Sequence, residues 1–111
     1  MLKCEGGGPD RVFHALADGN RRAVIERLTH GPATVSELAA LLGVTVAAVV
    51  QHIRVLEDSE LVRSEKVGRV RTCQIDTAGL RSAEAWLRRQ RTAWEHRLDR
   101  LGTVLDDQSK E

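Results

Sequence analysis

One stretch of the chain, residues 45–58, combines an apolar face with a second face of different character. Val49, Ile53 and Leu56 recur at helical spacing, which predicts that they face the protein interior. The other side carries side chains that are small or can hydrogen-bond: Thr45, Ala47, Val50, Gln51 and Arg54. Glutamine can pair with an adenine edge, arginine with guanine or a phosphate, and small apolar groups with a thymine methyl. These residue types predict a helix that reads double-stranded DNA, although a partly exposed helix in an ordinary helical domain shares the pattern.

A basic segment follows this helix. Residues 61–66 and 69–75 have the alternating pattern of strands and flank Val67-Gly68, which predicts a β-hairpin with a short turn. The hairpin has one acidic residue, Glu65, and four basic residues: Arg63, Lys66, Arg69 and Arg71. We expect Arg69 and Arg71 to share one side of their strand and all four basic side chains to contact phosphates. The alternative is a solvated hairpin whose charges protect a sheet edge.

The residues before this region predict shorter helices. The first helix is expected at about residues 10–17, with an apolar face that consists of Val12, Phe13, Leu16 and Ala17. After a break at Asp18-Gly19, Asn20 is the predicted N-cap of a second helix that buries Val24, Ile25 and Leu28 and ends near Gly31-Pro32.

The sequence Thr34-Val35-Ser36-Glu37 matches a capping box and opens a third helix. Its leucines are expected to point inward: Leu38, Leu41 and Leu42. The helix ends at Gly43, and Thr45 caps the next one. Two helices joined by a tight turn with glycine predict a helix-turn-helix. With the hairpin and a last helix, the order α-α-α-α-β-β-α predicts a mainly α fold with a small β-hairpin, a winged helix-turn-helix.

The last predicted helix, about residues 77–105, has apolar side chains at seven-residue intervals: Leu80, Leu87, Trp94 and Leu101. Leu98 and Leu105 add to this stripe, and Trp86 and Ala93 form a second apolar face. A helix with two apolar faces needs two partners, which we expect to be its own domain and a second copy of the chain. The expected dimer interface comprises Leu87, Trp94, Leu98 and Leu101.

Composition narrows the classes of protein. The chain has 111 residues, 41% hydrophobic and 30% charged, which predicts one soluble domain at 9–105 between a flexible lead-in at 1–8 and a polar tail at 106–111. The net charge of +1 means that any positive charge for DNA must be local. The sequence shows neither a membrane-spanning run nor the pattern of a signal peptide, so we expect a cytoplasmic protein without a membrane partner.

Three segments together resemble the ArsR/SmtB family of winged-helix regulators. They are Phe13 to Arg22; Val35 to Ala39 followed by Gln51 to Glu57; and the hairpin from Leu61 to Asp76. The resemblance covers about residues 10–105. It implies a homodimer that binds an operator of two-fold symmetry and represses transcription, often releasing DNA when an effector binds.

The chain departs from the family pattern at three places. Val50 stands where the family usually has serine, which removes a polar contact to DNA. Glu60 stands where the family usually ends its recognition helix on glycine; a left-handed conformation there would cost roughly 1 kcal/mol. Thr72 and Cys73 stand where a tyrosine is common on the second wing strand.

The sequence shows no metal-sensing pattern. The helix that opens at Thr34 has no Cys-x-Cys pair, and on the last helix His96 is adjacent to Glu95, so the two point about 100° apart. We therefore expect no metal and no cofactor. Cys4 and Cys73 could instead form a redox switch, although Cys73 is expected on the inward side of the hairpin, where thiols are usually inert.

Catalysis has no support, because the chain has neither a phosphate-binding glycine loop nor an arrangement of acids or nucleophiles. The leading hypothesis is a homodimeric repressor that binds an inverted-repeat operator, with no effector indicated. Two alternatives remain: a winged-helix module that binds protein, favoured by the near-neutral charge and Val50, and a thiol-gated repressor.

Overall fold

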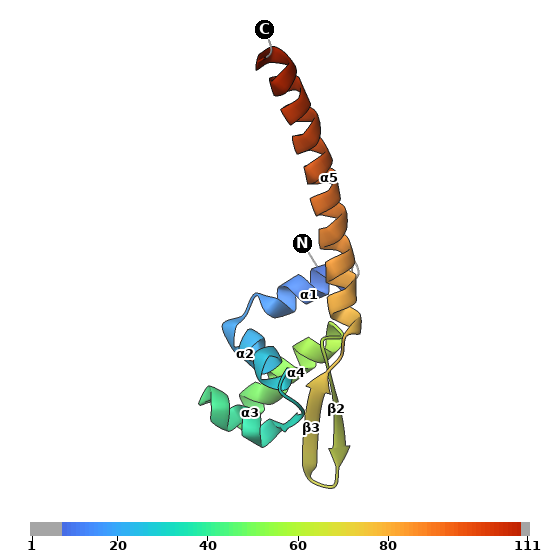
Figure 1. Ribbon diagram of the computed structural model, residues 1–111. Helices are drawn as coiled ribbons and strands as arrows, with labels where there is room; N and C mark the ends of the chain where they lie inside the picture. Colours follow the sequence, from blue (N-terminus) through green and yellow to red (C-terminus); the bar gives the residue numbers. More distant parts are fainter. Residues whose placement is uncertain (1–7, 110–111) are drawn as a thin grey trace, which may run out of the picture.

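The computed structural model describes residues 8–109 and has the predicted order of helices, with one additional strand (Figure 1). The elements are α1 (Gly8–Leu16), α2 (Gly19–Leu28), β1 (Ala33–Thr34), α3 (Val35–Leu42), α4 (Val46–Asp58), β2 (Val62–Val67), β3 (Val70–Ile75) and α5 (Ala78–Ser109). Of the expected lead-in, Gly8 already belongs to α1 and residues 1–7 lie outside the described residues. The expected tail is helical as far as Ser109. The winged helix-turn-helix prediction is confirmed.

The core lies between the first four helices and the sheet. Its largest fully buried side chains are Leu38, Ile53, Leu56, Leu61, Val12, Val24, Val49, Val62 and Cys73. Three residues that were predicted to face the interior are exposed: Phe13 (40%), Leu41 (58%) and Ala17, which lies beyond the end of α1. Phe13 and Leu41 lie roughly 130° and 110° around their helices from the centre of the buried stripe. In α3, that stripe is formed by Val35, Leu38 and Ala39.

The start of α2 corrects the predicted N-cap. Asp18, not Asn20, caps the helix, since its carboxylate accepts hydrogen bonds from the N–H groups of Asn20 (2.8 Å) and Arg21 (3.2 Å). The Arg21 hydrogen bond lowers the pKa of Asp18 below its ordinary value, against a smaller opposing effect of burial. The Arg21 and Arg22 side chains in turn donate to carbonyls at the end of α1, so this turn ties the first two helices together.

The predicted helix-turn-helix caps are confirmed. Thr34 Oγ1 accepts from the Glu37 N–H at 3.1 Å while the Glu37 carboxylate accepts from the Thr34 N–H at 3.2 Å. Gly43 ends α3 with a φ of 67°, a left-handed conformation that favours glycine. Thr45 Oγ1 accepts from the Ala48 N–H at 3.1 Å and begins α4.

The wing is the hairpin formed by β2 and β3, residues 62–75. It belongs to a three-stranded antiparallel sheet with the order β1-β3-β2. Sequence analysis missed β1, whose two residues pair Ala33 with Cys73 and Thr34 with Thr72. Val67 pairs with Val70, so the turn consists of Gly68 and Arg69 rather than Val67 and Gly68. Arg69 therefore lies in the turn, and the prediction that it shares a strand face with Arg71 is wrong.

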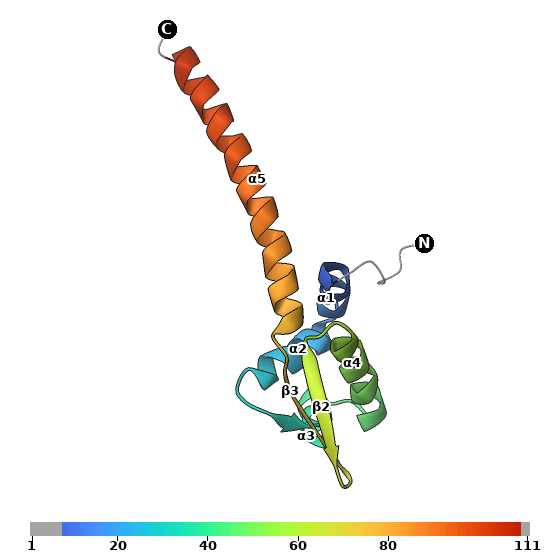
Figure 2. The same cartoon turned by 90° about the vertical axis from the view of Figure 1, so that its right-hand side faces the viewer.

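Helix α5 extends away from the rest of the molecule, as two views at right angles show (Figures 1 and 2). It has 32 residues, and the protein measures 74 × 29 × 22 Å. Leu80 and Ala83, near its start, pack against the domain's own core, so the expected seven-residue stripe begins within that core. No single described helix is long and apolar enough to cross a membrane; only α3 and α4 taken together, bent by 109°, reach the necessary length and composition.

Candidate nucleic-acid interface

Helix α4 presents most of its predicted recognition residues to solvent. Ala47, Gln51 and Arg54 are exposed, while Val49, Ile53 and Leu56 on the other side are buried. Val50 is half-buried and packs against the core, which gives an apolar side chain at this position a structural role as well. Thr45 is exposed at the start of the helix, with its hydroxyl oxygen engaged in the cap.

The register of the wing places its basic side chains on different faces. Lys66 pairs with Arg71, and paired residues of an antiparallel sheet project to the same side. By alternation, this is also the side of Ser64 and Cys73, whereas Arg63, one position along, projects to the other side. Like charges directly opposite each other destabilise a strand pair. Lys66 and Arg71 therefore form a concentrated cationic site that an anion would relieve.

A groove of about 480 Å³ separates this face of the wing from the helix-turn-helix. It is lined by the start of α3, by α4 and by the wing: Thr34, Val35, Ser36, Val46, Val50, Lys66, Arg69, Val70 and Arg71. A second, smaller hollow continues along α4, where Arg54 and Glu57 face Arg71. The groove thus brings together Val50 and three of the four predicted wing contacts, and it leaves Arg63 outside.

A chain of hydrogen bonds connects the wing to α4. Arg71 Nη1 donates to Ser64 Oγ at 2.8 Å, and Ser64 Oγ donates to the Glu57 carboxylate at 2.9 Å. Glu57 lies in the last turn of α4 and lines the smaller hollow together with Arg54. These hydrogen bonds fix one nitrogen of the Arg71 guanidinium, Nη1, and leave its other N–H groups available to a ligand.

The predicted dimer interface forms an exposed apolar stripe on α5. Its large side chains are all about half exposed or more: Leu87, Trp94, Leu98 and Leu101, with Trp94 at 59%. Nearer the domain, Trp86 meets Phe13 of α1 edge to face, with ring centroids 5.7 Å apart. The aromatic pair fastens the start of α5 to α1, and the stripe beyond it has no apolar cover within the described residues.

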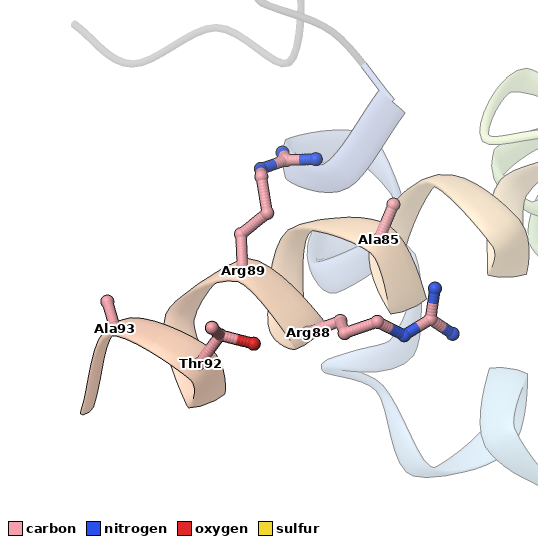
Figure 3. Close-up of a pocket in the computed structure, with 5 residues that line it drawn as sticks. All are labelled: Ala85, Arg88, Arg89, Thr92 and Ala93. Carbon is pink, nitrogen blue, oxygen red and sulfur yellow. The ribbon is translucent and has the colours of Figure 1, made fainter. Parts of the chain in front are cut away.

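The opposite side of α5 carries an open pocket of about 550 Å³ (Figure 3). It is lined by Ala85, Arg88, Arg89, Thr92 and Ala93, all from this one helix. Ala85 and Thr92 each lie two residues before a member of the apolar stripe, or roughly 200° around the helix. A ligand there would contact described residues from one side only.

Cys73 lies at the centre of the sheet. It is fully buried between Ala33 of β1 and Ser64 of β2. Burial, and to a smaller extent the Glu57 charge, raises its pKa to about 11, although Arg71 acts in the opposite direction. A thiol with a raised pKa is a poor nucleophile. Cys4 lies outside the described residues. Among residues 8–102, no three His, Cys, Asp or Glu side chains gather in a way that could hold a metal ion.

Sequence analysis missed several residues of this region. Ser36 is exposed in the first turn of α3 and lines the groove. In the sequence it is interpreted only as part of the capping-box motif. Ser64 is half-buried and links two elements that are not adjacent in the chain. In the sequence, Ser64 is simply a serine between Arg63 and Glu65 on a strand. Such a pattern is too common to have indicated a link to α4.

Comparison with known proteins identifies the family. Residues 16–65 match a model of the helix-turn-helix domain. Over 100 residues, the chain is 42% identical to the HTH-type transcriptional regulator Rv2034 of Mycobacterium tuberculosis, and the match covers 90% of this chain and 91% of that protein. The crystal structure of an ArsR family transcriptional regulator, RHA00566, matches with a TM-score of 0.74 and 49% identity, over 78% of this chain and 89% of that chain.

The chain belongs to the ArsR family of transcriptional regulators. It is therefore a transcriptional regulator with a helix-turn-helix DNA-binding fold and not an enzyme, which confirms the resemblance seen in the sequence motifs. The homodimeric winged helix-turn-helix DNA-binding domain Mb0332 from Mycobacterium bovis, described as a possible ArsR-family transcriptional regulator, matches with a TM-score of 0.58 and 28% identity, over 78% of each chain.

Proposed function

We propose that this ArsR-family regulator is a cytoplasmic homodimer that binds an inverted-repeat operator and represses transcription from it. Gln51 and Arg54 on the exposed face of α4 read base edges in the DNA major groove. Ala47, Val50 and Thr45 contact the same major groove beside them. Lys66, Arg69 and Arg71 hold phosphates. A dimer that covers two half-sites represses by excluding other proteins from the same DNA.

One observation carries this proposal: Val46 and Val50 of α4 and the cationic face of the wing line one groove, and Arg54 lines the smaller hollow beside Arg71. A helix in the major groove has phosphates on either side of it, so a recognition helix needs cations close beside it. The groove supplies Lys66, Arg69 and Arg71 in that position. We assign Arg63, on the other face of the wing, a smaller part than the sequence predicted.

The apolar stripe on α5 supports the homodimer. An α5 of 32 residues has little to stabilise it alone where it leaves the domain, and burial of Trp94 and three leucines would stabilise it by roughly 1.5–3 kcal/mol per side chain. A second copy of the same stripe is a self-complementary partner, as a two-fold interface requires. The homodimeric state of the related Mb0332 domain agrees with this assembly.

We propose that the regulator acts without the ligand pairs of its metal-sensing relatives. The first helix of the helix-turn-helix, α3, contains no cysteine, and His96 and Glu95 project in different directions from α5. Zinc at low micromolar concentration should therefore leave DNA affinity unchanged, and stoichiometric binding with release of DNA would show that a site is assembled across the dimer.

Binding-site selection from random duplex DNA tests the proposed function. We expect enrichment of an inverted repeat whose half-sites lie about one or two helical turns apart. Enrichment of a single unrepeated motif would contradict a two-fold complex. No enrichment, together with binding that does not depend on salt, would favour the alternative of a protein-binding winged-helix module.

A further inference from the structure

The end of α4 has an unusual backbone. Ser59 is a buried polar residue, and its hydroxyl donates to the Leu56 carbonyl at 3.0 Å in the last turn of the helix. Glu60 follows with a φ of 59°, a left-handed conformation at the position where the family usually has glycine. The Leu61 N–H then returns to the Leu56 carbonyl at 2.9 Å. This turn directs the carbonyl groups of Ser59 and Glu60 out of the helix and toward the start of α5.

Gly79, in the first turn of α5, meets those carbonyl groups. Its N–H donates to the Glu60 carbonyl at 2.9 Å, which satisfies one of the amides that a helix start leaves without a partner. A Cβ built at Gly79 would overlap the Ser59 carbonyl oxygen and lie 2.9 Å from the Glu60 oxygen. The obstructing atoms are backbone, so they cannot move aside as a flexible side chain would. Glycine is required here because of the close approach of the two helices.

Two further hydrogen bonds hold the same junction. The Asp76 N–H donates to the Leu61 carbonyl at 3.0 Å, and the Asp76 carboxylate accepts from the Ala78 N–H at 3.0 Å. The segment that leads into α5 is therefore fixed to Leu61, in the short connection between α4 and β2. The junction connects the proposed recognition helix directly to the proposed dimer helix.

We propose that Gly79 is a positioning residue that sets the spacing between the two recognition helices of the dimer, and hence the half-site spacing of the operator. This inference rests on the proposed function. Because α5 carries the dimer stripe and α4 reads the half-site, the angle and distance at their junction determine where each α4 lies relative to the two-fold axis. DNA fixes its half-sites at about 3.4 Å and 34–36° per base pair, so the complex tolerates little error.

The size of the expected change follows from the overlap. Alanine at position 79 must move the start of α5 by on the order of 1 Å from the end of α4 to relieve contact with backbone atoms. The dimer transmits this displacement twice, once in each subunit. The base contacts within one half-site are unaffected, since Gly79 lies outside the groove and outside α4.

Titrations of full-length protein with matched duplexes test the inference. The proteins are the native chain, Gly79→Ala and, as a control, Thr92→Ala, an exposed position on the same helix roughly 200° around from the apolar stripe. The duplexes are the selected operator, the same operator with its spacer lengthened or shortened by one base pair, and a single half-site. Sedimentation measures the dimer, and circular dichroism measures folding.

We expect Gly79→Ala to lose about tenfold or more in affinity for the native spacing while its half-site affinity and dimerisation stay within about twofold. Thr92→Ala should behave as the native chain does. A second variant, Asp76→Ala, removes the carboxylate that caps α5 and so loosens the junction without steric overlap. It should reduce the ratio of affinities for the native and the altered operator spacings by about threefold. Asp76→Ala decides the question if Gly79→Ala does not fold.

If the folded variants keep the native spacing preference while the native chain binds its operator, the role of Gly79 is overturned and the proposed function stands. A uniform loss of affinity on operator, half-site and random DNA would also overturn that role, since that result indicates general destabilisation. If the native chain itself shows no preference for operator over random DNA, the proposed function fails and this inference fails with it.

Discussion

The Arg71 guanidinium on the wing and the Glu57 carboxylate on α4 are joined through one hydroxyl, that of Ser64, by hydrogen bonds of 2.8 and 2.9 Å. This arrangement holds the wing arginine beside the recognition helix before any DNA is bound. Ordering a long side chain on binding costs about 0.5–1.5 kcal/mol, so a side chain that is already held avoids part of that cost.

Ser64→Ala should therefore weaken binding to operator and to random DNA alike, by about two- to tenfold. The charge of Arg71 is still present in this variant, so the dependence of log affinity on log salt should keep its native slope. Anisotropy titrations at several salt concentrations measure both quantities. Native affinity in Ser64→Ala would show that the hydrogen bonds do not prepare Arg71 for DNA.

Arg71→Ala should also weaken binding to both DNAs, but it should reduce the salt slope by about one unit, because a phosphate contact is lost. Arg63→Ala is the matched control. It removes the same charge from the same hairpin, on the face that lies outside the groove. Equal effects of the two substitutions would show that the wing acts through its total charge and that the groove has no special part.

Trp94→Glu should convert the dimer to monomers in sedimentation and abolish preferential operator binding. A carboxylate in the centre of a desolvated apolar stripe is strongly unfavourable. His96→Glu places the same charge two residues away, roughly 200° around the same helix, and should leave the dimer intact. If Trp94→Glu remains dimeric, or if the native chain is monomeric at micromolar concentration, the α5 stripe is not the interface.

Cys73 should react slowly with thiol reagents in the folded protein. With a pKa of about 11, its thiolate fraction at pH 8 is about one in a thousand, and its side chain is fully buried. In a Cys4→Ser background, the labelling rate at pH 8 should be at least about a hundredfold below that of the urea-unfolded chain. Rapid labelling accompanied by loss of DNA affinity would support the thiol-gated alternative.

The raised pKa of Cys73 also has a consequence for stability. The folded state holds this proton more tightly than the unfolded state, whose thiol has the ordinary pKa of 9.0. The contribution of the neutral thiol is thus complete below pH 9.0 and is lost as the pH rises toward about 11.

Local signals in the sequence predicted the helix-turn-helix well. Thr34, Gly43 and Thr45 each act through atoms a few residues away, so their caps can be deduced without knowledge of the fold. Asp18 and Asn20 are equally suitable N-caps two residues apart, and the choice between them depends on where α1 ends. Leu41 was wrongly assigned because apolar character alone does not show which side of α3 is covered.

Features that depend on distant pairing could not be predicted. Two residues, Ala33 and Thr34, form a strand only because β3 lies alongside them. The close approach of Gly79 to Ser59 depends on two helix ends separated by the whole wing. Which side of the wing each basic side chain occupies depends on the position of the turn. The turn lies at Gly68-Arg69, one residue later than the sequence indicated.

The central claim is that α4 reads base sequence, and Gln51→Ala tests it most directly. The measurement is the ratio of affinities for the selected operator and for random duplex DNA, in the native chain and in the variant, at the same salt concentration. We expect operator affinity to fall by about 1–3 kcal/mol and random-DNA affinity to change much less, so that the ratio falls by about tenfold or more. An equal loss on both DNAs, with the ratio unchanged, would contradict base reading by α4.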